Sequence, residues 1–163
     1  MSKPFVIKKL LDAPVDLAWE LCTSPVHLSH WFGPKGSSLV RSSMDLSVGG
    51  SFHYCLDMGG GQVWGLWKFV EIDPPRRLTL IQSFSDPAGG AARHPMAPIW
   101  PLYTLSTTTL VPEGGKTNLT LQWTPHEASA EEVAVFDASH ASMNQGWGGS
   151  FEVLEQYLAS LAQ

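Results

Sequence analysis

Clusters of basic residues are missing from this sequence of 163 residues, which has 10 Lys and Arg against 15 Asp and Glu and a formal net charge of -5. Nucleic acids and anionic membrane surfaces bind concentrated positive charge, so we expect neither as a partner. The chain also lacks the roughly 20 consecutive apolar residues of a membrane helix, and an N-terminal signal-peptide core. We therefore expect one cytoplasmic globular domain over residues 1–163, a length sufficient for a core of its own.

Catalytic and metal-binding signatures are missing as well. The sequence contains no Gly-x-Ser-x-Gly, Cys-x-x-Cys or His-Glu-x-x-His motif. Cys22 and Cys55 have no activating base nearby, so we expect free thiols instead of a disulfide or a nucleophile. His27 and His30 lack further ligands close in sequence, which favours a structural or surface pair over a metal site. We expect no catalytic residue, no metal and no cofactor.

The longest regular pattern runs from Ser129 to Ala162 and predicts one amphipathic helix, around which the chain is organised. Its apolar stripe recurs at steps of three or four residues and consists of Val133, Phe136, His140, Met143, Trp147, Phe151, Leu154, Leu158 and Leu161. Ser129 followed by Glu132 fits a capping box at the start of the helix. Such a helix must bury its stripe, and the strand-rich segment before it is the large partner on offer.

Two features interrupt this stripe. His140 is a polar residue in an apolar row; a hydrogen-bonded core or boundary histidine is the favoured interpretation, and a catalytic histidine is the alternative. Gly146, Gly148 and Gly149 surround Trp147, and each glycine inside a helix costs about 0.5–1 kcal/mol relative to alanine. Three glycines so close together predict a kink or the close approach of another backbone.

Before the long helix, the sequence predicts mainly strands, and it predicts helices only near the N-terminus. The expected elements are a strand over Phe5–Leu11, short helices from Pro14 and from Pro25 to His30, and strands over Ser37–Leu46, Phe52–Met58, Val63–Ile72, Leu78–Phe84, Leu102–Val111 and Thr117–Thr124. Helices at the ends of the sequence and strands between them indicate an α+β fold, with the long helix laid across one face of an antiparallel sheet.

The segment from Ser85 to Pro101 has no regular pattern. It contains four prolines and a Gly-Gly pair. Loops of this length are uncommon in compact domains and often serve as lids or binding loops. The sequence leaves two interpretations open: a lid over a binding cavity, or an insertion that the fold tolerates.

Several short motifs, distributed over the whole chain, resemble those of one known superfamily. They are Ala13-Pro14-Val15 with Trp19, Trp31-Phe32-Gly33-Pro34, Asp45–Phe52, Glu71–Leu78, Gly114–Leu121 and Gly146-Trp147. Together they resemble the START-like (SRPBCC) superfamily and, within it, bacterial proteins similar to the activator of the ninety-kilodalton heat-shock-protein ATPase. The resemblance implies a helix-grip fold, in which a curved antiparallel sheet of about six to seven strands surrounds the long C-terminal helix and encloses a hydrophobic cavity.

Seven tryptophans are many for a chain of this length, and several can line a cavity instead of filling a core. Given the implied fold, the candidate lining residues are Trp31, Phe52, Tyr54, Trp67, Trp123, His140, Met143 and Trp147. Convergent aromatic side chains with one or two polar groups suit a small apolar ligand. The same residues can also form a dry core, so this prediction depends on the fold and on the set as a whole.

Three functions are compatible with this sequence. The leading hypothesis is a non-catalytic protein that binds a small hydrophobic or aromatic molecule between the sheet and the helix. The second is a cyclase- or hydratase-type enzyme that uses His140 as general acid or base and Tyr54 as donor to an oxyanion. The third is a co-chaperone or another protein-interaction module. The sequence shows no strongly charged docking face, so a chaperone partner is ranked last.

The strand over Val63–Ile72 is apolar on both faces, although a sheet with one solvated face should alternate. Because Trp64 and Trp67 are separated by an odd number of positions, one of them must point to the outer face. An exposed apolar patch is typical of an interface, so we expect a homodimer that covers this face. The alternative is that the loop from Ser85 to Pro101 folds back over it.

Overall fold

The computed structural model describes residues 3–162. Its elements are β1 (Phe5–Leu11), α1 (Val15–Thr23), α2 (Pro25–Trp31), β2 (Ser38–Met44), β3 (Ser51–Asp57), β4 (Gln62–Asp73), β5 (Arg77–Ser85), β6 (Ala91–Ala92), β7 (Tyr103–Glu113), β8 (Lys116–His126), α3 (Ala130–Ala138) and α4 (His140–Leu161). Every predicted strand is present, as are both short N-terminal helices, with ends shifted by few residues. Within this part of the chain, no helix combines the length and apolarity needed to cross a membrane.

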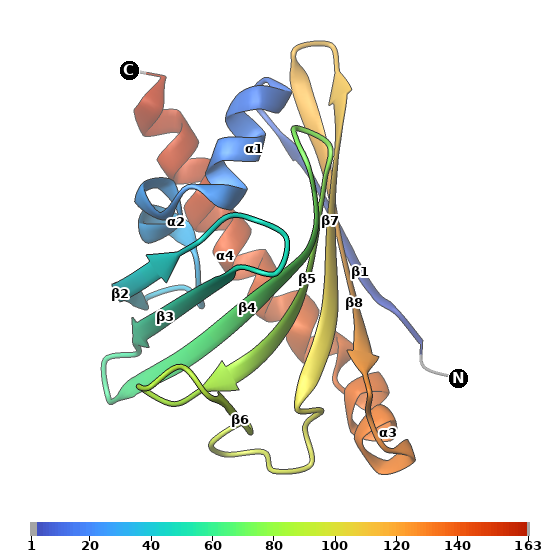
Figure 1. The fold of residues 1–163 in the computed structure, drawn as a ribbon. Helices are drawn as coiled ribbons and strands as arrows, with labels where there is room; N and C mark the ends of the chain where they lie inside the picture. Colours follow the sequence, from blue (N-terminus) through green and yellow to red (C-terminus); the bar gives the residue numbers. More distant parts are fainter. Residues whose placement is uncertain (1–2, 163) are drawn as a thin grey trace.

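The strands form one antiparallel sheet with the order β1-β8-β7-β5-β4-β3-β2, and the short β6 pairs with β5. Figure 1 shows that the sheet curves around α4, which crosses its concave side. Helices α1 and α2 cover one end of that side, and α3 lies near the other end. This is the α+β arrangement that the sequence predicted and the helix-grip fold that the resemblance implied.

The inner face of the sheet is defined by cross-strand pairing. Phe52 of β3 lies directly opposite Trp67 of β4, and both side chains are buried. Directly opposite residues of an antiparallel pair point to the same face. Because side chains alternate along a strand, Tyr54 and Phe69 also point inward. An aromatic row on β3 and β4 therefore faces α4.

The outer face of β4 carries Trp64, Leu66 and Val70, so Trp64 is the tryptophan that the odd spacing requires on that side. Its ring stacks on His53 of β3, with ring centres 4.9 Å apart. His53 Nε2 in turn lies 3.0 Å from the Asp86 carbonyl oxygen. The start of the 85–101 loop thus contacts the outer face at His53, and the homodimer stays a prediction.

The C-terminal segment forms two helices instead of the single helix that the sequence predicted. They are separated by Ser139, which has φ -102° and ψ 5°. The Ser139 hydroxyl donates to the Val135 carbonyl oxygen at 2.7 Å, a bond of the kind that bends helices. The predicted start is correct, because Ser129 and Glu132 form both hydrogen bonds of the capping box.

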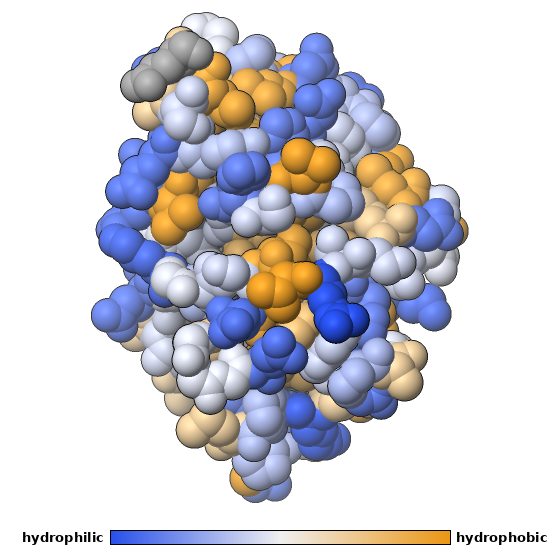
Figure 2. Space-filling view, turned by 90° about the vertical axis from the view of Figure 1, so that its left-hand side faces the viewer, coloured by the Kyte–Doolittle hydropathy of each residue, from blue (hydrophilic) through white to orange (hydrophobic). Residues whose placement is uncertain are grey.

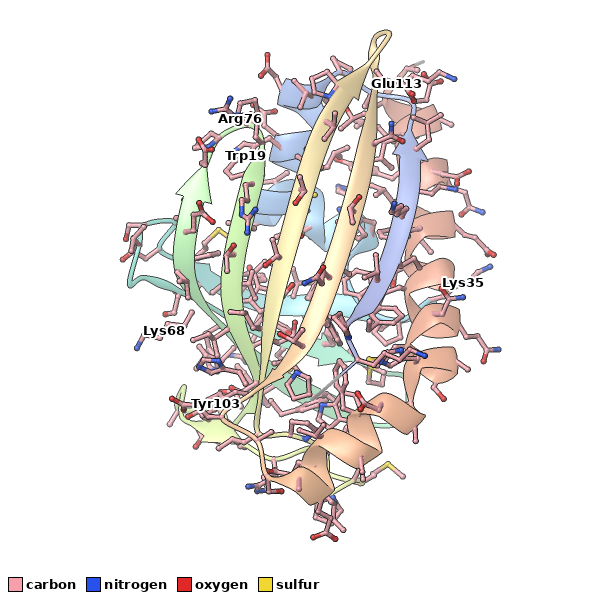
Figure 3. All side chains as sticks on the ribbon, turned by 90° about the vertical axis from the view of Figure 1, so that its right-hand side faces the viewer. Trp19, Lys35, Lys68, Arg76, Tyr103 and Glu113 are labelled. Atoms are coloured by element: carbon pink, nitrogen blue, oxygen red, sulfur yellow. The ribbon has the colours of Figure 1, made fainter. Side chains whose placement is uncertain are left out.

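The three glycines stay inside the continuous helix α4, so the interruption lies at Ser139 and not at the glycines. The predicted close approach of another backbone is not found: an added Cβ would meet nothing within 4 Å at Gly146 or Gly148, and at Gly149 it would lie 3.4 Å from the side-chain Cβ of Lys35. The neighbouring Ser150 hydroxyl donates to the Gly33 carbonyl oxygen at 2.5 Å. Figure 3 shows Lys35 beside α4, although the two are far apart in sequence. These contacts join the loop after α2 to the middle of α4.

The C-terminal half of α4 belongs to the main core. Phe151, Leu154 and Leu158 are buried in one cluster with apolar residues of α1, α2 and the inner face of the sheet. The N–H of the Trp31 indole donates to the Leu21 carbonyl oxygen at 2.9 Å, so this buried tryptophan has its hydrogen bond. This end of the molecule is solidly packed.

Candidate functional site

A cavity of about 550 Å³ lies between the sheet and the N-terminal half of α4. Its walls include the segment after α2, the β3–β4 hairpin, the inner face of β5, part of the 85–101 loop, and α4. Its apolar lining includes Phe32, Tyr54, Leu56, Met58, Val63, Phe84, Trp123, Met143 and Trp147. Pockets that hold small organic molecules have volumes of about 300–1000 Å³, so the cavity is large enough for such a molecule.

A smaller space of about 40 Å³ lies next to the cavity, on the side of the packed core. The two spaces share Phe32, Gln82 and Trp147 as lining residues. The smaller one is otherwise bordered by core leucines of β5 and β8 and by Trp31 and Trp67. It therefore adjoins the cavity where the aromatic row of the sheet meets the core, and we call it the inner end of the cavity.

Six of the eight residues predicted to line a ligand site border these two spaces. Tyr54, Trp123, Met143 and Trp147 line the large cavity, and Trp31 and Trp67 line the small space. Phe52 lies behind them, with its ring centre 5.0 Å from that of Tyr54 and 4.9 Å from that of Trp67. His140 lines neither space.

His140 lies at the first turn of α4, between the rings of Phe5 and Phe136, at centre distances of 5.8 and 5.5 Å. Its Nε2 is buried and has no hydrogen-bond partner among residues 3–162. The favoured interpretation of a hydrogen-bonded core histidine is therefore wrong at this nitrogen; aromatic packing holds the ring. The cyclase-type pairing of His140 with Tyr54 is not formed, because Tyr54 lines the cavity and His140 does not.

Phe32 is a lining residue that the sequence reasoning missed. Its ring meets those of Tyr54 and Trp67 edge-on, at centre distances of 5.0 and 5.1 Å. Each such pair contributes about 0.5–1.5 kcal/mol beyond the area that it buries. The next residue, Gly33, has φ +103°, a conformation that favours glycine. The signal that could have identified Phe32 is its place directly before this glycine, because the glycine turn fixes the position of the aromatic ring.

Tyr54 lies against the backbone of β4. A Cβ added to Gly65, its partner across the strands, would overlap the Tyr54 ring and hydroxyl, so a glycine is needed there. Burial raises the pKa of the Tyr54 hydroxyl well above its ordinary value, and the adjacent Trp67 indole acts in the opposite direction. The hydroxyl therefore stays protonated at neutral pH and remains a hydrogen-bond donor.

The other polar groups of the lining are few and neutral. No Asp, Glu, Lys or Arg lines either space in the described part of the chain. The Trp123 Nε1 donates to the Ser106 hydroxyl at 3.0 Å, so its N–H is already used. Cys22 and Cys55 are buried free thiols, as predicted, and burial raises the pKa of Cys22, which borders the small space, to about 12. A protonated thiol is a poor nucleophile.

The 85–101 loop contributes His94, Pro95 and Met96 to the cavity wall, the position expected of a lid. The His94 ring packs edge-on against Phe84, with ring centres 4.7 Å apart. The Met96 backbone N–H donates to His94 Nδ1 at 3.0 Å, so the neutral imidazole carries its proton on Nε2. Burial lowers the pKa of His94, which favours this neutral form.

Arg93 attaches the same loop to α3. Its Nη1 lies 2.6 Å from Glu132 Oε2, and the same nitrogen lies 3.4 and 3.3 Å from the carbonyl oxygens of Pro98 and Trp100. The backbone hydrogen bond at Ser129 and the bond from Arg93 lower the pKa of Glu132 to about 2. One carboxylate thus caps α3 and holds the loop.

His27 and His30 flank Tyr157 at the contact between α2 and α4. His27 Nδ1 lies 2.6 Å from the Tyr157 hydroxyl oxygen, and the His30 ring stacks on the Tyr157 ring at 4.4 Å. Among residues 3–162, no three His, Cys, Asp or Glu side chains are placed together to hold a metal ion. The histidine pair therefore has a structural role, the interpretation that the sequence favoured.

The cavity differs from the outside of the molecule in the way its apolar residues are arranged. Figure 2 shows that apolar residues on one side of the surface form small groups, separated by hydrophilic residues. In the cavity, aromatic and aliphatic side chains from α4, β3, β5 and β8 converge on one space. This convergence makes the cavity the candidate functional site.

Comparison with solved structures finds close likenesses in overall fold. A protein from Rhodobacter sphaeroides has a TM-score of 0.77 at 18% identity, covering 99% of this chain and 95% of that one. Protein Ms6760 from Mycobacterium smegmatis has a TM-score of 0.76 at 21% identity, covering 95% and 90%. A protein from Arthrobacter aurescens has a TM-score of 0.76 at 25% identity, covering 96% and 86%. No match was found among curated proteins.

Comparison with protein families identifies a family as well as a fold. A family described as activator of Hsp90 ATPase homolog 1-like protein matches residues 12–159. The match includes both short helices, the sheet from β2 onward and most of α4. It agrees with the resemblance carried by the sequence motifs. The chain belongs to the activator of Hsp90 ATPase homolog 1-like family.

Proposed function

We propose that this protein binds a small, largely apolar molecule in the cavity between the sheet and α4. One observation carries the proposal: a space of about 550 Å³ has an aromatic and aliphatic lining without any charged side chain. Transfer of apolar surface from water into such a lining contributes about 25 cal/mol per Å². A charged ligand would lose its hydration there without gaining a partner of opposite charge.

Two details of α4 and the loop support a binding site over a core with a packing fault. Gly146 lines the cavity, and a Cβ added to it would meet nothing within 4 Å. The helix therefore exposes bare backbone where an apolar side chain would otherwise fill the space. The cavity is also bordered by His94, Pro95 and Met96 of the loop, which is held to α3 through Arg93.

Binding can be tested with N-phenyl-1-naphthylamine, a neutral apolar probe that fluoresces when it leaves water. We expect a saturable rise in its emission with the wild-type protein. Excitation of tryptophan should also sensitise the probe, because Trp123 and Trp147 line the cavity. Absence of a saturable signal from this probe and from a panel of neutral aromatic molecules would argue against the proposal.

A pair of helix variants locates the binding. Gly146→Leu places a side chain in the cavity and should abolish probe binding. Gly148→Leu is the matched control, since Gly148 also has open space around its Cβ position but does not line the cavity. Equal affinities of the two variants for the probe would show that the probe binds elsewhere. Thermal unfolding of both variants confirms that each one is folded.

A chaperone-directed role is not favoured by any contact described above. The family description refers to an activator of Hsp90 ATPase, and that activity belongs to the protein after which the family is named. Stimulation of a chaperone ATPase by the purified protein is the direct assay. A cavity-blocked variant that still stimulates it would separate that role from ligand binding.

A further inference from the structure

The buried indole N–H of Trp67 has no hydrogen-bond partner. The side chain is 7% exposed, and its Nε1 has neither a protein partner nor surface open to solvent among residues 3–162. A buried donor without a partner costs about 1–3 kcal/mol, and native proteins retain very few of them. By contrast, the indoles of Trp31 and Trp123 both donate to protein oxygens. The unpaired N–H of Trp67 therefore requires an explanation.

Trp67 borders the space at the inner end of the cavity. That space and the cavity share Phe32, Gln82 and Trp147, so they adjoin one another, and a ligand group that extends from the cavity into this space would meet Trp67. An indole N–H can donate but cannot accept. The group that completes it must therefore be an acceptor.

A second donor lies beside the first. Tyr54 and Trp67 lie on the same face of adjacent strands, with ring centres 6.1 Å apart. The Trp67 side chain acts on the Tyr54 hydroxyl as a hydrogen-bond partner would and lowers its pKa, but the indole N–H does not meet the distance and angle of a full hydrogen bond with it. Tyr54, whose hydroxyl keeps its proton, lines the large cavity. Tyr54 borders the large cavity and Trp67 the space next to it, so the two side chains meet where these spaces adjoin.

The charge of the acceptor follows from the residues around it. Neither space has a Lys or Arg to pair with a carboxylate or a phosphate, nor an Asp or Glu to pair with an ammonium group, within residues 3–162. A buried ion without a partner is strongly disfavoured, whereas a neutral oxygen needs hydrogen bonds alone. The donors therefore suit a neutral carbonyl-type oxygen.

We propose that the ligand is a neutral molecule with an apolar body and one terminal carbonyl-type oxygen, which accepts hydrogen bonds from Trp67 Nε1 and the Tyr54 hydroxyl at the inner end of the cavity. This inference rests on the proposed binding function and adds the polarity and orientation of the ligand. The oxygen enters first, and the apolar body fills the space beside Met143 and Trp147. Gln82, directly opposite Trp67 in the sheet, borders the same region.

Two probes of matched shape test the inference. In 2-acetylnaphthalene a ketone oxygen occupies the place that a methylene group occupies in 2-isopropenylnaphthalene. With the wild-type protein we expect the ketone to bind about tenfold more tightly than the alkene, the gain of one or two hydrogen bonds. Equal affinity of both probes for the wild-type protein would overturn the inference and leave the proposed binding function intact.

Two variants assign the preference to the two donors. Trp67→Phe removes the indole N–H, so the affinity ratio of ketone to alkene should fall towards one. Changes of volume cancel in this ratio, because both probes meet the same altered wall. Tyr54→Phe removes one hydroxyl with little change of shape and should lower the ratio by about threefold. A ratio that Trp67→Phe leaves unchanged would place the ketone oxygen elsewhere and refute the inference.

A spectrum of the unmodified protein covers the case in which Trp67→Phe does not fold. The seven tryptophans give separate indole N–H signals in a ¹H–¹⁵N correlation spectrum. One of these signals should move downfield on addition of the ketone and stay in place with the alkene. If every indole signal responds alike to both probes, the inference fails. If neither probe binds and N-phenyl-1-naphthylamine does not bind either, the proposed function fails with it.

Discussion

The two halves of α4 face the same curved sheet but leave different interiors. In the C-terminal half, Leu154 is 0% exposed and packs into the cluster that joins α1, α2 and the sheet. In the N-terminal half, Gly146 and Met143 border a cavity of about 550 Å³. Figure 3 shows the corresponding ends of the sheet, with Arg76 and Glu113 at one end and Tyr103 near α3 at the other.

This difference follows from side-chain volume and not from a difference in backbone. The helix is continuous from His140 to Leu161. Leucines and Phe151 fill the space at the packed end, whereas Gly146 borders the cavity at the open end, and an added Cβ there meets nothing within 4 Å. A few residues of α4 therefore decide where the interior is packed and where it contains a cavity.

The largest effect is expected from Leu154→Ala in the packed half. Removing a fully buried leucine side chain leaves a hole and should lower the free energy of unfolding by about 2–5 kcal/mol. Urea unfolding followed by tryptophan fluorescence measures the change. Met143→Ala in the open half is the matched control and should change stability by no more than about 1 kcal/mol. Equal losses in both variants would contradict the division of α4 into a packed half and an open half.

The next largest effect is expected from Gly65→Ala on the cavity wall. The added methyl group would overlap the Tyr54 ring, and overpacking of this kind costs about 1–3 kcal/mol. Because the ring must move, binding of N-phenyl-1-naphthylamine should weaken as well. Gly60→Ala in the nearby hairpin is the control, since an added Cβ there has open space. A stable Gly65→Ala variant with unchanged probe affinity would show that Tyr54 has room to move.

Local signals allowed much of the fold to be predicted from the sequence. Alternating apolar residues and the turns between them gave the strands, and Ser129 with Glu132 gave the start of the C-terminal helices. Each of these signals lies within a few residues. Because Trp64 and Trp67 are an odd number of positions apart, one of them had to point outward. The pairing of Phe52 with Trp67 was needed to show which one.

The site was harder to predict, because it depends on contacts between distant segments. The prediction extended the helical period through Ser139, and this placed His140 in the cavity lining. In the structure, the interruption at Ser139 leaves His140 between Phe5 and Phe136. Phe32 and His94 were missed because they lie outside regular strands and helices. The size of the cavity depends on the spacing between α4 and the sheet, which no short stretch of sequence contains.

A smaller gain in stability is expected from Gly148→Ala. Replacing a glycine inside a helix by alanine stabilises it by about 0.5–1 kcal/mol where the methyl group has space. Gly149→Ala should gain less, because its Cβ would lie 3.4 Å from the Lys35 Cβ. Thermal unfolding of the two variants provides the comparison. A larger gain at Gly149 than at Gly148 would mean that the loop after α2 adapts freely.

The contact between Glu132 and Arg93 predicts a pH dependence at the open end. Because the folded protein lowers the pKa of Glu132 from 4.5 to about 2, its stabilising effect is fully present above the ordinary pKa. It is lost as the pH falls through that interval. Glu132→Gln retains a residue suited to the capping box but removes the charge. The melting temperature of the wild type should therefore fall more steeply than that of Glu132→Gln. Parallel curves would exclude a stabilising role for this carboxylate.

The smallest effect on the folded chain is expected from Val70→Lys on the outer face of β4. Val70 is 45% exposed and lines neither space, unlike Trp64, which also borders the cavity. A charge there should leave the free energy of unfolding of the monomer within about 0.5 kcal/mol of the wild type. If the apolar outer face forms the predicted homodimer, the variant should be monomeric by light scattering while its probe affinity is unchanged. A wild-type protein that is already monomeric at high concentration would instead leave His53 and the start of the 85–101 loop as the cover of this face. In that case the packed half and the open half of α4 would both be features of the monomer.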